Sequence, residues 1–126
     1  MRLDSIGQIR INVRDVRRAV AFYRDVLGMR FLFDVPEQGL AFFDCGGVRL
    51  YLAAGIPEGP KTTAAIYYAV DSVEMAYETL RSRGVEFENA PHTVYTTDTV
   101  EGRMAFFEDS EGNSLALMAE RPLGAA

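Results

Sequence analysis

The chain has 126 residues and a mass of 14.0 kDa, a size typical of one domain. Hydrophobic residues make up 48% of it, and no apolar run approaches the ~20 residues of a membrane span. The net charge of −5 disfavours a nucleic-acid partner, and one cysteine with one histidine cannot supply the four ligands of a zinc finger. Because Cys45 has no cysteine to pair with, we expect a reducing, cytoplasmic setting.

The sequence consists of two similar copies of about 55–60 residues, a two-fold duplication rather than a longer repeat array. The first copy begins at Ile9 with IRINVRDVRRAVAFYRDVLG, and the second begins at Ile66 with IYYAVDSVEMAYETLRSRG. Further along, Ala41-Phe42-Phe43 in the first copy matches Ala105-Phe106-Phe107 in the second. We expect modules over residues 5–55 and 64–119, joined by a Pro- and Gly-containing linker at 56–63, with a loose tail at 120–126.

The first copy predicts a strand, a helix and three further strands. Residues 9–13 alternate apolar and polar side chains, as a two-faced strand does. Asp15 is a typical N-cap for the apolar helical pattern over 16–27, and Gly28 supplies the left-handed position that ends it. Strands are predicted over 29–35, 40–44 and 48–53, with a tight hairpin at Gly46-Gly47.

The second copy predicts the same order of elements. We expect a strand over 64–70, a helix capped by Asp71 or Ser72 and ended by Gly84, and strands over 85–89, 103–108 and 114–118. His92, which follows Pro91, is also expected to begin a strand. Residues 109–113, DSEGN, have the composition of a turn.

Two motifs indicate the family. The segment AFYRDVLG at 21–28 and the segment FEDSEGN at 107–113 resemble the motifs of the vicinal oxygen chelate superfamily, in which a proline usually stands at the position of Ser110. That superfamily contains glyoxalase I, bleomycin resistance proteins and extradiol dioxygenases. The resemblance implies an α+β fold in which two βαβββ modules in tandem form one domain over 1–126. Curved sheets would then enclose a cavity, with helices outside.

The resemblance also places the family's four metal ligands in this sequence. They fall on Gln8, Tyr51, Ala65 and Ala116. Alanine has no donor atom, and amide and phenol groups are poor ligands for the divalent ions that prefer imidazole and carboxylate. We therefore expect no metal and no other cofactor, and neither glyoxalase I nor extradiol dioxygenase activity.

The strand pleat then predicts which side chains face the cavity. If Gln8 points inward, Arg10 and Asn12 do so as well, and Ala65 and Ala116 leave space where metal ligands would stand. Apolar walls with a few placed polar groups are typical of a small-molecule site, although the tyrosines and Met118 would also serve simply to fill a barrel. The candidate ligand-binding residues on these faces are Gln8, Arg10, Asn12, Arg49, Tyr51, Ala65, Tyr67, Ala116 and Met118.

His92 and Arg103 complete the candidate set. Histidine titrates near neutrality and suits proton transfer, so His92 is a candidate acid or base at the rim of the cavity, together with Tyr51. Arg103 offers a clamp for a carboxylate or phosphate. The alternatives are a loop histidine with a structural role and a solvated strand-end arginine.

Two functions of different classes follow from these residues. The first is a metal-free protein that binds and sequesters a small organic molecule, with no nucleic-acid or membrane partner. The second is a metal-independent lyase or isomerase that uses His92, Tyr51 or Tyr67 as acid or base. We also expect a homodimer, because the apolar segments 31–33, 40–43 and 104–107 are hard to bury in one chain of this size.

Overall fold

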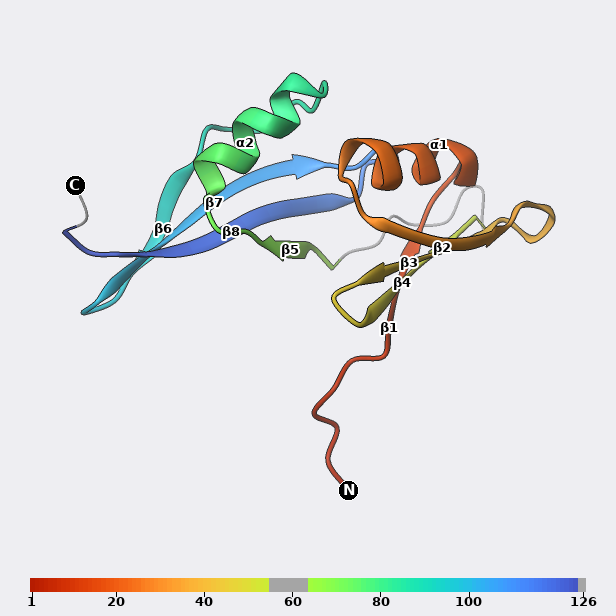
Figure 1. Cartoon of the computed structure of the whole chain (residues 1–126), viewed down its shortest axis with the longest axis horizontal. Helices are drawn as coiled ribbons and strands as arrows, with labels where there is room; N and C mark the ends of the chain where they lie inside the picture. Colours follow the sequence, from red (N-terminus) through yellow and green to blue (C-terminus); the bar gives the residue numbers. More distant parts are fainter. Residues whose placement is uncertain (55–63, 125–126) are drawn as a thin grey trace. The chain divides into compact units, whose positions relative to one another are not determined.

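The computed structural model describes residues 1–54 and 64–124 and divides them into two compact units (Figure 1). The first unit comprises residues 1–54 and 109–113, and the second comprises residues 64–108 and 114–124. Each unit contains one four-stranded sheet and one main helix, so the α+β class and the two βαβββ modules are confirmed. The expected linker at 56–63 lies outside the described residues.

In the first unit, the chain runs through β1 (Gln8–Asn12), α1 (Val16–Ala21), the π-helical turn η1 (Phe22–Val26), β2 (Arg30–Val35), the 3-10 turn η2 (Pro36–Gln38), β3 (Leu40–Cys45) and β4 (Val48–Ala53). The strand order in the sheet is β1-β4-β3-β2. β1 is parallel to β4, and the other neighbours are antiparallel. β1 and β4 can pair in parallel because α1 and the strands β2 and β3 lie between them in the chain, which lets β4 run beside β1 in the same direction.

The predicted start and stop signals of this unit are in place. An Asp15 carboxylate oxygen accepts a hydrogen bond from the Arg18 backbone N–H at 3.1 Å, as an N-cap does. Gly28 follows the helix with φ = 72°, a conformation that a side chain would disfavour. Gly46 and Gly47 have φ values of 61° and 93°, which matches the tight hairpin turn between β3 and β4.

The second unit repeats the arrangement with β5 (Ile66–Ala69), α2 (Val73–Ser82), β6 (His92–Thr96), β7 (Val100–Glu108) and β8 (Ser114–Pro122). The strand order is β5-β8-β7-β6, which corresponds strand for strand to the first sheet. Of the two candidate caps, Ser72 holds the helix: its hydroxyl oxygen accepts from the Met75 backbone N–H at 3.2 Å.

Two boundary predictions in the second unit are wrong. Residues 85–89 do not form a strand and pair with the sheet only at the bridge between Phe87 and Phe107; regular pairing starts at His92, after Pro91, which has no N–H to donate. Residues 120–122 are not a loose tail, because β8 continues to Pro122 along the lengthened β7, where Glu120 pairs with Gly102.

The core of each unit lies between its helix and one face of its sheet. In the first unit α1 contacts β3 and β4, and in the second α2 contacts β7 and β8 (Figure 1). Leu50 and Leu52 on β4 and Leu115 and Leu117 on β8 are buried in these cores. Within the described residues, no helix has the length and apolar character needed to cross a membrane.

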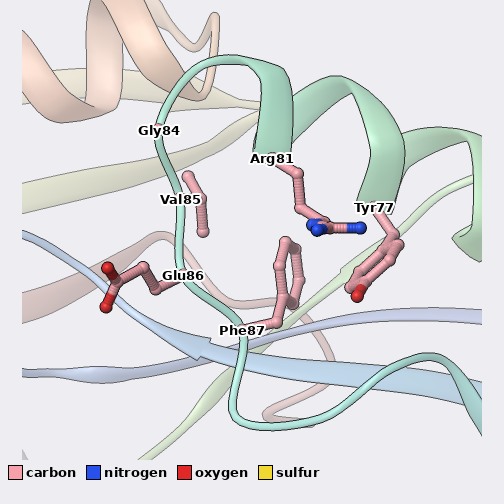
Figure 2. Close-up of a pocket in the computed structure, with 6 residues that line it drawn as sticks. All are labelled: Tyr77, Arg81, Gly84, Val85, Glu86 and Phe87. Atoms are coloured by element: carbon pink, nitrogen blue, oxygen red, sulfur yellow. The ribbon is translucent and has the colours of Figure 1, made fainter.

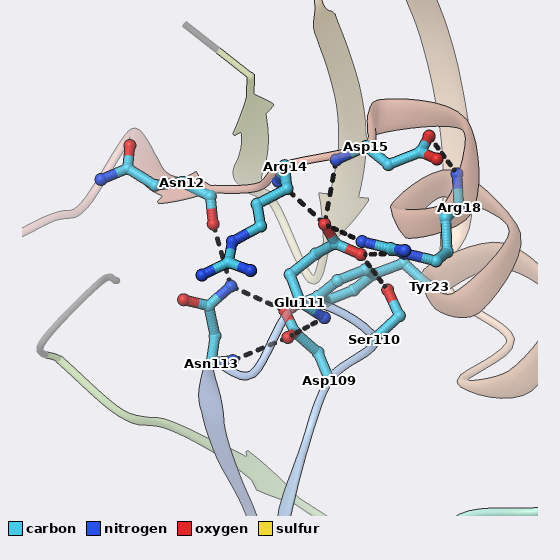
Figure 3. Close-up of polar contacts among 9 residues, drawn as sticks. All are labelled: Asn12, Arg14, Asp15, Arg18, Tyr23, Asp109, Ser110, Glu111 and Asn113. Atoms are coloured by element: carbon cyan, nitrogen blue, oxygen red, sulfur yellow. Dashed lines mark hydrogen bonds and ion pairs between the residues drawn. The ribbon is translucent and has the colours of Figure 1, made fainter. Parts of the chain in front are cut away.

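The loop 109–113 belongs to the first unit although its flanking strands belong to the second. The Glu111 side chain is 1% exposed, and its carboxylate accepts hydrogen bonds from the backbone N–H groups of Arg14 and Asp15 at 2.8 and 3.0 Å (Figure 3). The Arg18 guanidinium donates to both of its oxygens, at 2.7 and 3.1 Å. Burial alone would raise the pKa of Glu111, but these donors outweigh it and lower the pKa from 4.5 to about 2.

Asp109 and Asn113 complete the loop. The Asp109 carboxylate accepts from the Tyr23 hydroxyl at 2.7 Å and from the Glu111 and Asn113 backbone N–H groups at 2.8 Å (Figure 3). The Asn113 amide donates to the Asn12 carbonyl at 3.0 Å, at the end of β1. Tyr23 and Asn113, taken from the two recognition motifs, therefore act together in one buried polar network.

We expect Glu111→Gln to lower the free energy of unfolding by about 3 kcal/mol near neutral pH, because an amide leaves part of this buried network unsatisfied. The stabilisation from a depressed pKa is full above about pH 4.5 and is lost as the pH falls towards about 2. The difference between variant and wild type should therefore shrink over that range in urea unfolding experiments.

Glu78→Gln is the matched control, since Glu78 is 71% exposed and only 3.8 Å from Arg81. It should change the unfolding free energy by less than about 0.5 kcal/mol. A Glu111→Gln variant that is as stable as Glu78→Gln would show that the loop 109–113 does not stabilise the fold through Glu111.

Candidate functional site

The face of the first sheet turned away from α1 carries a row of side chains that crosses all of its strands. The strand register aligns Arg10 on β1 with Tyr51 on β4, Tyr51 with Phe42 on β3, and Phe42 with Phe33 on β2. We call these four residues the aromatic ladder. Residues in one register row stand side by side on the same face of a sheet, so their side chains interact directly.

The rings of the ladder are stacked. The centroids of Phe33 and Phe42 are 4.7 Å apart, and those of Phe42 and Tyr51 are 4.8 Å apart with an interplanar angle of 9°. The Arg10 guanidinium carbon lies 5.7 Å from the centre of the Tyr51 ring, and that of Arg49 lies 5.4 Å from the centre of Phe42. These distances are those of aromatic stacking and cation–π contacts.

The ladder remains accessible to a ligand. Phe33 is 46% exposed, Phe42 and Tyr51 are half-buried, and Arg10 and Arg49 are exposed. Gln8 and Asn12 lie on the same face of β1 as Arg10, with Gln8 opposite Arg49 and Asn12 opposite Ala53. The first sheet thus places on one face all of the candidate ligand-binding residues that the sequence predicted on its strands.

The corresponding face of the second sheet holds a smaller aromatic group. The register aligns Tyr67 with Ala116 and Ala116 with Phe106, and it aligns His92 with Met104 and Met104 with Met118. The Phe106 ring contacts Tyr67 edge-on at 6.0 Å and lies 5.9 Å from the His92 ring. Tyr67, His92, Ala116 and Met118 therefore share one face, as predicted.

The space expected at Ala116 is not there. Ala116 has no exposed surface, and its cross-strand neighbours are the large side chains Tyr67 and Phe106. Ala65 precedes β5 and is exposed. A small residue on a strand leaves room only where its neighbours are small as well, and here they are aromatic.

Arg103 is separated from the other candidates. It occupies the alternate position next to Met104 on β7, so its side chain is on the α2 side of the sheet. There its guanidinium donates to the Glu74 carboxylate at 2.8 and 3.0 Å and to the Pro91 carbonyl at 3.3 Å. The hydrogen bond from Arg103 lowers the pKa of Glu74. Arg103 thus joins helix and sheet within the second unit.

His92 is held in a defined orientation. Its Nδ1 lies 3.0 Å from the Ala90 carbonyl oxygen, and because a carbonyl only accepts, Nδ1 carries the hydrogen. The neutral ring then keeps its lone pair on Nε2, where it can act as a base or as an acceptor. Of the two catalytic candidates, His92 has this arrangement, whereas Tyr51 is part of a ring stack.

Sequence reasoning missed several residues on these faces. Phe42 and Phe106 belong to the repeated Ala-Phe-Phe segments, and since Phe43 and Phe107 are buried, strand alternation alone places the preceding phenylalanines on the opposite face. Tyr95 was missed as well. Its hydroxyl donates to the Glu120 carboxylate at 2.6 Å, which raises the pKa of Tyr95, and its ring lies so close to Gly102 that a β-carbon there would be 2.2 Å from it.

A surface hollow on the second unit is a different feature (Figure 2). It is lined by Tyr77, Arg81, Gly84, Val85, Glu86 and Phe87. The Arg81 guanidinium lies 5.2 Å from the centre of the Tyr77 ring, and the rings of Tyr77 and Phe87 are 4.7 Å apart. These side chains pair with one another, and none of the predicted site residues lines the hollow.

The residues at the family's metal positions do not fit a metal ion. Tyr51 is stacked between its neighbours in the ladder, and Ala65 and Ala116 have no donor atom, which leaves the Gln8 amide. Within residues 1–54 and 64–124, no group of three or more His, Cys, Asp or Glu side chains is placed to hold a metal. We therefore derive no chemical step through a metal for this chain.

Comparison with known families agrees with the fold and the motifs. The family model of the Glyoxalase/Bleomycin resistance protein/Dioxygenase superfamily matches residues 5–117. The chain belongs to this superfamily. An uncharacterized protein of Bacillus subtilis (strain 168), YraH, is 30% identical, and the match covers 87% of this chain and 94% of YraH.

Solved structures of superfamily members have the same fold. The lactoylglutathione lyase from Agrobacterium tumefaciens superposes with a TM-score of 0.75 at 22% identity, covering 94% of this chain and 95% of the lyase. TnmS3, an antibiotic binding protein from Streptomyces sp. CB03234, superposes with a TM-score of 0.73 at 24% identity, covering 93% of this chain and 96% of TnmS3. The superfamily fold thus serves both an enzyme and a binding protein.

The residues at the ligand positions predict that the purified protein carries no stoichiometric transition metal. Metal analysis after purification without chelators should find less than about 0.1 ion per chain, since one amide cannot hold a divalent ion alone. One tightly held ion per chain that is lost in a Gln8→Ala variant would contradict the prediction.

Proposed function

We propose that this superfamily member binds and sequesters a small organic molecule on the aromatic ladder without a metal or other cofactor, in the cytoplasm and without a nucleic-acid partner. The observation that supports the proposal is the ring of Tyr51. It stands at a position where the superfamily's metal chemistry needs a carboxylate, and it is stacked instead against Phe42 and Arg10. A stacked tyrosine ring at this position suits packing against a ligand, whereas a carboxylate would hold a metal that polarises the ligand.

The physical properties of the ladder suit this role. Aromatic rings bury a large area and have few rotatable bonds, and stacked rings lose little further freedom when a ligand covers them. The half-buried rings are flanked by Gln8, Asn12 and the arginines, which can orient a ligand through hydrogen bonds. That the superfamily includes an antibiotic binding protein supports the same class of function for this chain.

A second candidate function rests on His92. Its Nδ1 is engaged by the Ala90 carbonyl, which leaves Nε2 as a base near the Phe106 ring. This arrangement supports a metal-independent lyase or isomerase. The two functions differ in the fate of the ligand: a sequestering protein returns it unchanged, whereas an enzyme returns a product.

We expect Phe42→Leu and Tyr51→Leu to weaken binding of any molecule that a native mass screen of metabolites and antibiotics identifies. Each variant keeps an apolar side chain but removes a ring, so affinity should fall about tenfold while the fold is retained. Tyr77→Leu is the control, because it removes a half-buried ring on α2 that is not part of the ladder. Unchanged affinity in both ladder variants would remove the ladder from the site.

We further propose that the chain is a homodimer. β2 is an edge strand of the first sheet, and Leu32 on it is 37% exposed; an apolar edge strand favours pairing with a second copy of the chain. Sedimentation at micromolar concentration should give twice the 14.0 kDa of one chain. A single species with the mass of one chain would show that the protein is a monomer.

A further inference from the structure

We propose that the ligand of the aromatic ladder is a planar aromatic carboxylate, whose acid group is bound by Arg10 and Arg49. This inference rests on the proposed binding function and names the chemical class of the ligand. It arises from a contrast between these two arginines, which lie against aromatic rings, and the arginines that are paired with carboxylates.

Five of the other arginines are paired with carboxylates. Within the described residues, ion pairs join acidic side chains to Arg18, Arg24, Arg81, Arg103 and Arg121. Arg10 and Arg49 form no ion pair with a described carboxylate. They have aromatic partners instead, Tyr51 and Phe42. Their charges are therefore available to an acidic ligand.

The two guanidinium groups are on the same side of the sheet, against two neighbouring rings of the ladder. Arg49 precedes Tyr51 by two residues on β4, and Arg10 is paired with Tyr51 across the strands. A guanidinium that lies against a ring still offers the N–H donors in its own plane. Arg10 uses one of these, Nε–H, on the Asn12 side-chain oxygen at 3.3 Å. The remaining donors suit the paired oxygens of a carboxylate.

The charges on this face add up to an anion-binding surface, although the whole chain carries −5. The strand register puts one acidic residue, Asp44, on the same face, between Arg49 and Arg30. One Asp44 carboxylate oxygen accepts from the Gly47 backbone N–H at 3.2 Å. The strands of this face thus present Arg10, Arg30 and Arg49 against a single carboxylate, beside stacked rings.

The corresponding face of the second sheet lacks this combination among its described residues. On its corresponding face the described strand residues include Tyr67, His92, Phe106 and the Tyr95–Glu120 pair, and the nearby Arg103 points to the other side. Aromatic surface therefore occurs in both units, whereas aromatic surface combined with unpaired guanidinium groups occurs in the first. A ligand that needs both must itself combine a flat apolar ring system with a negative charge.

Two fluorescent probes of the same shape test the inference: anthracene-2-carboxylate and its uncharged carboxamide. At about pH 7 the carboxylate should bind the wild-type protein at least about tenfold more tightly than the carboxamide, as expected for charge-assisted hydrogen bonds. The double variant Arg10→Gln/Arg49→Gln should bind the carboxylate no better than the carboxamide. The quantity that tests the inference is the ratio of the two affinities, which should fall to about one in this variant whatever its affinity for the carboxamide.

Arg17→Gln/Arg24→Gln is the matched control. It removes the same formal charge from exposed positions on α1 and η1, so it should leave the preference for the carboxylate in place. Raising salt from about 0.05 to about 0.5 M should weaken binding of the carboxylate and leave the carboxamide unaffected.

The outcomes separate this inference from the proposed function. Equal binding of both probes, lost in Tyr51→Leu, would overturn the inference and support the ladder as a neutral aromatic site. Binding of neither probe by the wild-type protein would overturn the inference as well. Displacement of the carboxylate by a single-stranded oligonucleotide at equal concentration would assign the arginines to nucleic acid and overturn it too.

Discussion

The start of helix α1 is held by a carboxylate that comes 97 residues later in the chain than Arg14. Glu111 accepts hydrogen bonds from the backbone N–H groups of Arg14 and Asp15, the two residues that lead into α1, and it does so while buried and ionised. Because Asp109 in the same loop binds Tyr23, the loop holds the α1–η1 segment at its start and again within η1. Because α1 packs on β3 and β4, its position decides which face of the first sheet is buried and which is exposed.

With the helix packed on one face of each sheet, strand alternation decides the rest. The buried residues Leu50 and Leu52 face α1, so Tyr51 between them faces away. The same logic turns Phe42 outward next to the buried Phe43. The aromatic ladder is thus a consequence of core packing on the opposite side, and its side chains are free to vary in chemistry without disturbing the core.

The fold was predictable from sequence because its signals are local and occur twice. Caps such as Asp15 and turn glycines such as Gly28 act through their own neighbours, and the duplication doubles the evidence for each element. The site was predictable only in part. Alternation placed Arg10, Tyr51 and Tyr67 correctly on their faces, but Arg103 stands one position out of phase and pairs with a helix residue. Long-range partners such as Glu111 with Arg14 leave no periodic trace in the sequence, so that network had to come from the structure.

The burial of Ala116 bears on how this chain can change in evolution. A glutamate there would have to displace Tyr67 and Phe106, its neighbours across the strands, and would bring an unpaired charge into a position with no exposed surface. At Tyr51 a glutamate would interrupt the stack between Phe42 and Arg10. Metal chemistry at these positions would therefore need several coordinated substitutions, each unfavourable on its own. Drift at the exposed arginines, in contrast, meets no such barrier and can alter which ligands the protein accepts.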